Sequence, residues 1–413
     1  MEPVSSHSAL GYLARVATVL LGWAVFSIAL TVLVDPYRTY GTPTLSGWTE
    51  LKPRIYQQSG IAKTSQLERV APKTLLLGNS RVEIGFDPDS KVWPAAYKPV
   101  FNGAVAGTGL PTSLAMLRDS IAVRPPQTVF LGVDFQDFLT RQDTISTSPP
   151  GGAPDERRLL VARQGDRNRG RVWQVWRDRF ATTLTFDALS DSVLTLIDQD
   201  PMTTVTMTRS GFNPLQEYSL YAQRVGYYGL FRAKNNDYQQ QYSKYRMPDF
   251  SKPDRLANFH DLAAIVSLAR EHHIKLVLFT HAYHAEYLEM LHRRGLWPSF
   301  EQWKHSLAEF ASGANVPLYD FAEYDAFTTE QVPRPNDTAH VMRWYWEPGH
   351  YKSALGDEVL KAMIYRTGSF GRTLKPENEA EAMQEVRSQR ASYLSHRGGA
   401  GRKPIAVRQL MSH

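Results

Sequence analysis

Residues 74 to 81 read Thr-Leu-Leu-Leu-Gly-Asn-Ser-Arg, a short apolar run that ends in a glycine, an asparagine and a serine. Such a run, bounded by turn-forming residues, is typical of a buried strand. Gly78 permits a sharp turn after the strand, which places Ser80 at the carboxyl edge of the sheet, where α/β folds carry their sites. The segment therefore predicts a first strand and a candidate nucleophile. The alternative is that Asn79 or Ser80 only caps the following helix.

Further apolar runs follow at intervals too long for hairpins and predict more buried strands. They are Pro99–Phe101, Thr128–Val133, Lys275–Thr280 and a weaker run at Pro317–Phe321. Helical patterns lie between several of them, most clearly from Leu256 to Ala269, where apolar residues recur every three to four positions. Alternating strands and helices predict an α/β domain with a parallel sheet covered by helices on both faces.

The N-terminal run Val16–Val34 carries no charge, and about 20 such residues suffice to cross a bilayer. It follows a short N-terminal segment, residues 1–15. The chain continues with Asp35 and Pro36 rather than a small-residue cleavage site, so we predict a retained transmembrane helix rather than a cleaved signal. A buried core helix is the alternative, although a helix apolar on every face is atypical of a globular core so near the N-terminus.

The side of the membrane is not decided by the flanking charges, because Arg15 precedes the span while Arg38, Lys52 and Arg54 follow it. The chain has no cysteine, which excludes disulfides and thiolate metal sites and fits an oxidising compartment. We expect a single-pass protein of a bacterial inner membrane with its soluble head in the periplasm.

The net charge of +6 does not indicate nucleic acid. From Gly371 onward there are eight Lys or Arg and four Glu, so most of the excess lies in the last 43 residues. Without a basic stripe on the folded part, no nucleic-acid groove is indicated. Residues 371–413, including Gly398–Gly401, are expected to form a basic, partly disordered tail.

Residues 35–70 are rich in glycine and proline and are interpreted as a linker before an α/β domain at residues 71–370. The strand–helix rhythm fails at about 141–254, which opens with a Ser/Pro/Gly loop, Ser146–Pro154. Trp173, Trp176 and Phe180 stand there at helical spacing, so we expect a largely helical insertion over one edge of the sheet. Its seven tyrosines between Tyr218 and Tyr245 are either a sugar-stacking surface or ordinary packing.

Three more segments carry polar groups to the same edge. A glycine-rich turn, residues 103–109, follows the second strand and offers backbone N–H groups to a substrate oxyanion. Asp134 follows the third strand. Near the end of the domain Glu347 and His350 stand three residues apart, in an expected loop that leads into a helix. This spacing lets a carboxylate orient an imidazole whose other nitrogen faces a serine.

This order of motifs, Gly-x-Ser, Asn-x-x-x-x-Gly, Gly-x-Asp and acid-x-x-His, resembles the SGNH/GDSL hydrolase superfamily. More narrowly, it is similar to the membrane-anchored SGNH-like proteins found with bacterial exopolysaccharide genes. The match covers roughly residues 71 to 365 outside the insertion and rests on the shared order of short motifs. It implies a flavodoxin-like three-layer α/β/α domain, a Ser–His–acid triad, and esterase or O-acyltransferase chemistry, often on polysaccharide acetyl groups.

The resemblance implies that Ser80 is the nucleophile, His350 the general base, Glu347 the orienting carboxylate and Gly107 a backbone oxyanion donor. The family usually has an Asn donor where this chain has Asp134, and an ionised carboxylate donates no hydrogen bond. Losing one such donor typically costs about 2.7 to 4 kcal/mol in the transition state. A protonated Asp134 or the Asn79 amide are substitutes; otherwise the protein is slow or inactive. Glu347 also replaces the usual Asp.

Two further features accompany this constellation. Arg81 is a cation at a helix N-terminus, which predicts a carboxylate partner, Asp87 or Asp134, or an anionic substrate. His281 and His284 follow the fourth strand, and we expect them to line the substrate cleft rather than bind a metal, which needs three or four convergent ligands. Neither a metal nor an organic cofactor is implied.

The leading prediction is a membrane-anchored O-acetyltransferase or esterase that acts on an extracellular polysaccharide. Its partners would be an acylated polysaccharide or acyl donor and proteins of an export complex, with no nucleic acid. The alternative is a non-catalytic SGNH-like component that binds a glycan or scaffolds such a complex, which Asp134 favours.

Overall fold

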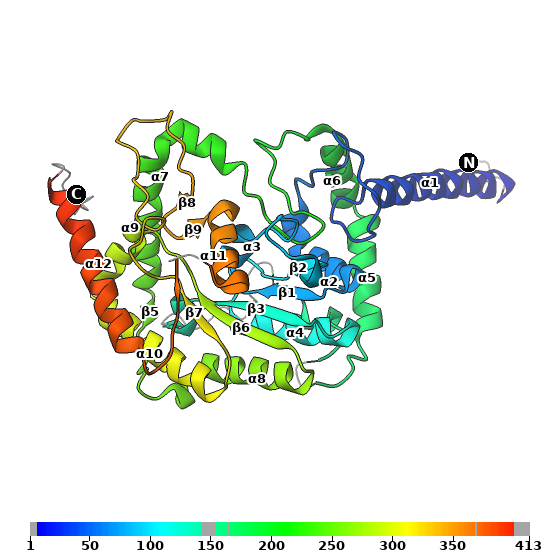
Figure 1. Cartoon of the computed structure of the whole chain (residues 1–413). Helices are drawn as coiled ribbons and strands as arrows, with labels where there is room; N and C mark the ends of the chain where they lie inside the picture. The colour runs from blue at the N-terminus through cyan, green and yellow to red at the C-terminus, as the bar shows by residue number, and fades with distance from the viewer. Residues whose placement is uncertain (1–5, 142–152, 163–164, 368–369, 400–413) are drawn as a thin grey trace.

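A six-stranded sheet forms the centre of the head, and five of its strands are parallel (Figure 1). The strands lie in the order β10-β7-β6-β3-β1-β2, with β10 antiparallel to β7. Their bounds are β1 Thr74–Leu77, β2 Val100–Asn102, β3 Thr128–Val133, β6 Lys275–Thr280, β7 Leu318–Asp320 and β10 Arg372–Thr373. The five predicted strands are confirmed. They could be recognised because strands buried on both faces consist of continuous apolar residues.

The structure is a computed structural model, and it describes residues 6–141, 153–162, 165–367 and 370–399. Most of the predicted Ser146–Pro154 loop, and the part of the predicted tail that follows Gly399, lie outside the described residues.

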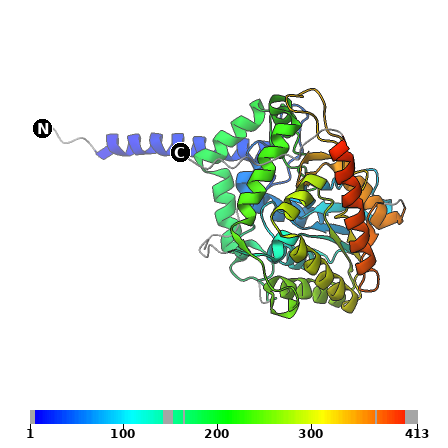
Figure 2. The same cartoon turned by 90° about the vertical axis from the view of Figure 1, so that its left-hand side faces the viewer.

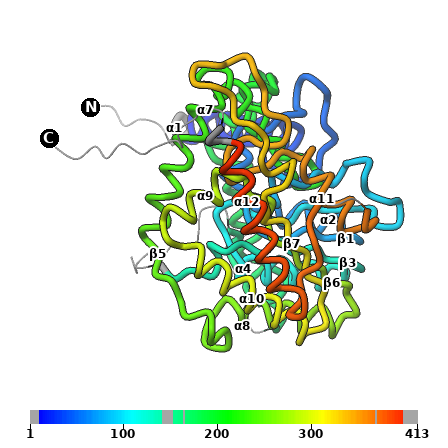
Figure 3. Tube along the Cα trace, turned by 60° about the vertical axis from the view of Figure 1, so that its left-hand side comes forward, coloured from blue at the N-terminus to red at the C-terminus, as the bar shows by residue number. Residues whose placement is uncertain are grey.

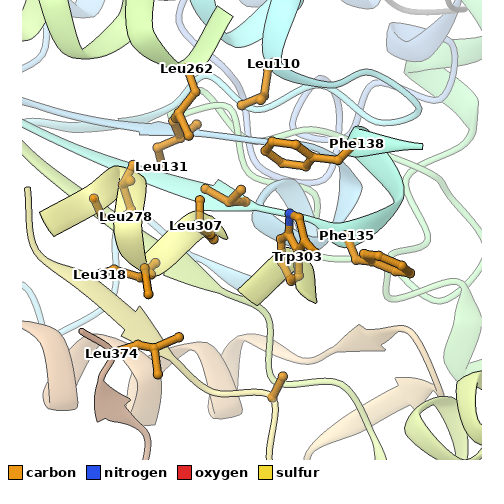
Figure 4. Packing of buried hydrophobic residues seen from close by; sticks show 14 of the residues in the cluster. Leu110, Leu131, Phe135, Phe138, Leu262, Leu278, Trp303, Leu307, Leu318 and Leu374 are labelled. Carbon is orange, nitrogen blue, oxygen red and sulfur yellow. The ribbon is translucent and has the colours of Figure 1, made fainter. Parts of the chain in front are cut away.

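Alternate residues of the five parallel strands face two separate hydrophobic cores. Leu75 and Leu77 of β1 pack into one core, and Leu76 packs into the other. The first core gathers side chains from the helices α2 Ser59–Val70, α4 Leu110–Val123, α8 Ala257–Glu271, α9 Ala285–Arg293, α10 Trp297–Gly313 and α12 Glu379–Gly399. Figure 4 shows its centre, where Leu131 and Leu278 of the sheet meet Leu262 and Leu307 of the helices. Each fully buried side chain of this size contributes about 1.5–3 kcal/mol.

The second core lies on the opposite face of the sheet. It is covered by α3 Ser80–Gly85, α7 Tyr218–Tyr242 and α11 Ser353–Tyr365. Together the two cores make three layers, with the sheet in the middle. The predicted α/β domain is confirmed, and its sheet is parallel as predicted except at β10, which the sequence did not indicate. Helix α8 matches the helix predicted from Leu256 to Ala269.

Two predicted boundaries differ from the structure. The segment interpreted as a linker contains α2, whose Leu67 is fully buried in the first core. The segment interpreted as a basic, partly disordered tail supplies β10 and α12. Helix α12 contacts α10 (Figure 3), and its Met383 and Val386 are buried in the first core. In both segments a few apolar residues stand at helical spacing among many polar and charged ones. The overall composition is therefore polar and does not indicate that these helices pack against the core.

The insertion joins the head through a two-stranded antiparallel pair, β4 Thr140–Arg141 and β5 Tyr245–Arg246. Between them lie α5 Arg171–Thr183, α6 Phe186–Ile197 and the long helix α7. Helix α7 reaches back over the second core, where Leu230 and Phe231 are fully buried.

The N-terminal helix α1, Ser6–Val34, projects from the head (Figures 1 and 2). Taken singly, Leu10–Val34 is the one helix of the described chain that is long and apolar enough to cross a membrane. It begins before the predicted Val16, because residues 6–15 continue the same helix. Only its last turns are covered by the head, at Ser27, Thr31 and Val34.

Candidate active site

Glu347 and His350 lie opposite each other in a short hairpin. Strands β8 Tyr345–Glu347 and β9 His350–Tyr351 are antiparallel, with Glu347 paired to His350 across the turn formed by Pro348 and Gly349. The Gly349 N–H donates to Glu347 Oε2 at 2.9 Å, which holds the carboxylate in place. We expected a loop here, and the structure instead explains the spacing of three residues, since a two-residue turn makes the acid and the imidazole direct neighbours.

The hairpin brings His350 to Ser80. Nε2 of His350 lies 2.8 Å from Ser80 Oγ, and Nδ1 contacts Glu347 Oε1. Because the carboxylate accepts the proton of Nδ1, Nε2 is left as an acceptor for the serine hydroxyl. The three side chains therefore have the connectivity of a serine, a general base and an orienting acid. Ser80 is partly exposed and the His350 side chain is 20% exposed, whereas Glu347 is buried.

Close backbone packing seats the hairpin on α3. Gly85, the last residue of α3, lies against the ring of Tyr351, where a Cβ atom would stand 2.2 Å from the ring. Gly356 of α11 approaches even closer, since a Cβ atom there would lie 1.7 Å from the Gly85 carbonyl oxygen. No side chain fits at either contact, so both glycines are needed to bring β9 and α11 against the segment that carries Ser80.

Tyr238 of α7 is a member of the site that the sequence did not single out. Its hydroxyl donates to Glu347 Oε1 at 3.0 Å and lies 3.3 Å from His350 Nδ1. Burial raises the pKa of Glu347, but His350, the Gly349 N–H and the Tyr238 hydroxyl outweigh it and hold that pKa below its usual value. Tyr238 was one tyrosine of a cluster interpreted as packing or sugar stacking, and its burial supports the first interpretation.

On the inner side of α3, Arg81 forms a buried ion pair with Asp134. The carboxylate also accepts from the Asn79 amide, at 3.0 Å, and from the Tyr283 hydroxyl, at 3.0 Å. Burial raises the pKa of Asp134, but Arg81, together with His281 and Asn79, outweighs it and holds that pKa below its usual value. Of the partners considered for Arg81, the structure selects Asp134, not Asp87 or an anionic substrate.

This pair corrects the predicted roles of both residues. Arg81 is 4% exposed and Asp134 is not exposed, so neither is available to an oxyanion or a substrate. The alternative of a protonated Asp134 is also wrong, because its partners favour the ionised form. Arg81 instead ties parts of the site together. Its Nε donates to the Gly349 carbonyl at 3.0 Å, and its guanidinium lies over the ring of Tyr283 at 5.2 Å.

The backbone around Ser80 limits the donors for an oxyanion. Asn79 caps α3, with its Oδ1 accepting from the Arg81 N–H at 3.0 Å, so the capping alternative and the serine site coexist. The N–H groups of Val82 and Glu83 bond to the Asn79 carbonyl. In this described turn, the Ser80 N–H is the remaining backbone donor next to the serine hydroxyl. The Asn79 amide, expected as a substitute donor, is directed to Asp134.

The glycine-rich loop after β2 lies next to this turn. The Val105 N–H donates to the Gly78 carbonyl at 3.3 Å, and Gly107 is exposed with φ +72°, a conformation that favours glycine. At the end of the loop, Gly109 lies against the Asp137 carboxyl. Burial and the adjacent Asp134 raise the pKa of Asp137 well above its usual value, and a neutral carboxyl can donate a hydrogen bond.

The two histidines after β6 are not exposed to a substrate. His281 is fully buried, with Nδ1 3.2 Å from the Tyr351 hydroxyl. His284 caps α9, accepting from the Glu286 N–H, and its Nε2 bonds the Glu330 carbonyl. The prediction that they line the cleft is wrong, because the chain turns inward after Thr280.

Within the described part of the chain, no group of three or more His, Cys, Asp or Glu side chains is arranged to hold a metal ion. No protein-family model matches the chain, and no curated protein matches its sequence.

Proposed function

We propose that this protein is a membrane-anchored SGNH-like O-acyltransferase or esterase that uses Ser80, His350 and Glu347 on acyl esters of an extracellular polysaccharide. The observation that carries the proposal is the continuous chain of contacts from Ser80 Oγ through both nitrogens of His350 to Glu347. These residues are 270 positions apart at the serine–histidine contact, and the fold brings them together at the carboxyl end of β1.

Each residue has a defined role in the reaction. Ser80 Oγ attacks the acyl carbonyl while His350 Nε2 accepts its proton, and Glu347 stabilises the imidazolium that forms. The tetrahedral intermediate collapses to an acyl-serine, and the leaving alcohol takes the proton from His350. A sugar hydroxyl or water then loses a proton to His350 and attacks the acyl-serine. The bond between the acyl carbon and Ser80 Oγ breaks, and His350 returns the proton to Ser80 as the product leaves. The Ser80 N–H is the backbone donor at the developing oxyanion.

Strand order supports the resemblance to the SGNH fold. The parallel strands lie as β2-β1-β3-β6-β7, which in chain order is the 2-1-3-4-5 arrangement of flavodoxin-like sheets. Ser80 follows β1, next to the point where the strand order reverses between β1 and β3, and such switch points are where these folds bind ligands.

Helix α1 supports an anchored enzyme, and the resemblance favours a head on the periplasmic side of a bacterial inner membrane. A C-terminal alkaline phosphatase fusion of the full chain, expressed in bacteria, tests this side of the proposal. Phosphatase activity in intact cells is the expected result. Full-length fusion protein without phosphatase activity would contradict it, because the reporter forms its disulfides only outside the cytoplasm.

The catalytic proposal is tested with Ser80→Ala in the full-length protein. We expect loss of 4-nitrophenyl acetate hydrolysis by purified protein and a changed acetyl content of the polymer made by the producing cells. Ser90→Ala is the matched control, because the Ser90 hydroxyl bonds a carboxylate, Asp357 at 2.7 Å, where Ser80 bonds the imidazole of His350. Unchanged hydrolysis and unchanged acetyl content in Ser80→Ala would overturn the proposal.

A second candidate function is a non-catalytic SGNH-like module that binds a glycan or scaffolds an export complex. It is favoured by the ionised, buried Asp134 and by the Asn79 amide that is bonded to it, which together remove two side-chain donors from the oxyanion site. This function would be selected if wild type and Ser80→Ala bound acetylated polymer with equal affinity and wild type hydrolysed neither the polymer nor 4-nitrophenyl acetate.

A further inference from the structure

Helices α5 and α6 expose most of their large apolar side chains and bury several of their polar ones. The residues turned toward the protein are Asp178, Thr182, Asp191, Ser192 and Thr195, all buried. The residues turned outward are Trp173, Trp176, Phe180, Phe186, Val193 and Ile197, with Trp173 78% and Phe186 77% exposed. A helix on the surface of a water-soluble domain has the opposite arrangement. This surface therefore faces something other than water.

The buried polar face is held by specific bonds, so the outward apolar face is a feature of the fold. Arg158 Nη2 lies 3.1 Å from Asp178 Oδ2 in a buried ion pair. The Tyr37 hydroxyl, 154 positions away, donates to the Asp191 carboxylate. Turning the aromatic side chains inward would break these contacts.

The two helices lie where α1 enters the head. Thr31 Oγ1 of α1 donates to the Thr183 carbonyl at the end of α5. Figures 1 and 2 show α5 and α6 on the side of the head from which α1 projects, running across its direction. If α1 crosses a bilayer, the outward face of α5 and α6 is at the level where α1 leaves the hydrocarbon.

Charge and side-chain type fit the same surface. Arg177 and Arg179 of α5 are exposed, as are Arg167 and Arg169 just before it. Tryptophan, phenylalanine and arginine together are typical of helices that lie in the headgroup region and contact anionic lipids. Leu45 and Trp48, in the segment that follows α1, add exposed apolar side chains near the end of α6, where Gln199 accepts from the Glu50 N–H.

We propose that α5 and α6 form an interfacial helix pair that lies in the headgroup layer of the membrane spanned by α1, with Trp173, Trp176, Phe180 and Phe186 inserted and the arginines on anionic lipid phosphates. The pair lies on the membrane rather than crossing it, because its 13 and 12 residues are bent by 55° and its polar face is paired with the head. The head then has a second membrane contact that fixes its orientation. This goes beyond the proposed chemistry and holds for a catalytic or a binding head.

The lack of cysteine allows a direct test with single-cysteine variants of the full chain. Trp173→Cys and Phe186→Cys carry a nitroxide and are reconstituted in vesicles of phosphatidylcholine and phosphatidylglycerol. Accessibility to oxygen and to a water-soluble nickel chelate gives the depth of each label. Leu20→Cys in α1 reports the anchor, and Val341→Cys, 67% exposed on the loop before β8, is the matched control in water.

We expect the labels at 173 and 186 to favour oxygen over nickel several-fold relative to the label at 341, at a depth of about 5–10 Å. The proposal would be overturned if the labels at 173 and 186 were as accessible to nickel as the label at 341. A label at position 20 that lies in the bilayer would then leave the anchor intact. Low accessibility to both reagents would overturn it in favour of a protein partner. A water-like label at position 20 would reject the anchor and the interfacial contact together.

Discussion

The two sides of α3 carry two charged networks that differ in accessibility and in purpose. On the outer side, the β8–β9 hairpin presents Glu347 and His350 to Ser80, with the imidazole partly exposed. On the inner side, Arg81 and Asp134 are buried. Both networks contain an acid and a base, but only the outer one contacts a group that a substrate can reach.

The difference shows that neighbouring residues of one short helix have separate roles. Ser80 and Arg81 are consecutive, yet they point into different networks. Changes to the outer network should alter the rate with little effect on stability, and changes to the inner network should alter stability. The predictions below test this separation, from the largest expected effect to the smallest.

His350→Ala should abolish esterase activity, because Ser80 then has no base. We expect a loss on the order of 10⁴-fold in kcat, which corresponds to about 5.5 kcal/mol of activation free energy. The free energy of unfolding, measured by urea titration, should fall by less than for Arg81→Met below, because the Glu347 carboxylate keeps the Gly349 N–H and the Tyr238 hydroxyl as donors. A rate within tenfold of wild type would place the base elsewhere.

Arg81→Met should destabilise the fold, because it leaves the Asp134 carboxylate buried without its cation. Breaking a buried pair in this way costs about 3–5 kcal/mol. The control is the double variant Arg81→Met with Asp134→Asn, which removes both charges and should recover much of the loss. Equal urea midpoints for wild type and Arg81→Met would show that the inner network does not stabilise the head.

His281→Gln should make the protein less sensitive to acid. Burial lowers the pKa of His281 to about 3, whereas an unfolded histidine titrates near 6.5, so the unfolded chain binds the extra proton as pH falls between these values. His281 therefore lowers the stability of wild type below pH 6.5, by about 2 kcal/mol at pH 5 relative to neutral pH. The glutamine variant lacks this contribution. Parallel pH–stability curves for the two proteins would contradict the prediction.

Tyr238→Phe should slow the reaction modestly, because Glu347 loses one hydrogen bond but keeps the Gly349 N–H. We expect about 1.5 kcal/mol, or roughly tenfold in kcat, with KM unchanged. Tyr242→Phe is the matched control, one turn further along α7, where the hydroxyl bonds Tyr287 instead of the triad. Equal rates for the two variants would remove Tyr238 from the site.

The strands of the sheet could be predicted from sequence because their burial on both faces makes them apolar throughout. Thr128–Val133 and Lys275–Thr280 agree residue for residue with β3 and β6. The hairpin at 345–351 was interpreted as a loop because its strands have only three and two residues and no alternating pattern. Its spacing still identified the acid and the imidazole.

Long-range packing was the part that the sequence concealed. Tyr238 reaches Glu347 from 109 positions away, and nothing in its own segment indicates this partner. The position after β6 suggested an accessible His284, but the chain there turns inward to begin α9. The helical spacing of Trp173, Trp176 and Phe180 was recognised, whereas the outward direction of that face depends on how Asp178 and Asp191 bond to the head.

The most direct test of the central claim, that His350 activates Ser80, is covalent labelling of the full-length protein with a fluorophosphonate, followed by peptide mapping. An activated serine reacts with this reagent, and an ordinary hydroxyl does not. We predict a single phosphonylated residue, Ser80, in wild type, with labelling lost in Ser80→Ala and strongly slowed in His350→Ala. An unlabelled wild-type protein, or a label on another residue, would contradict the claim.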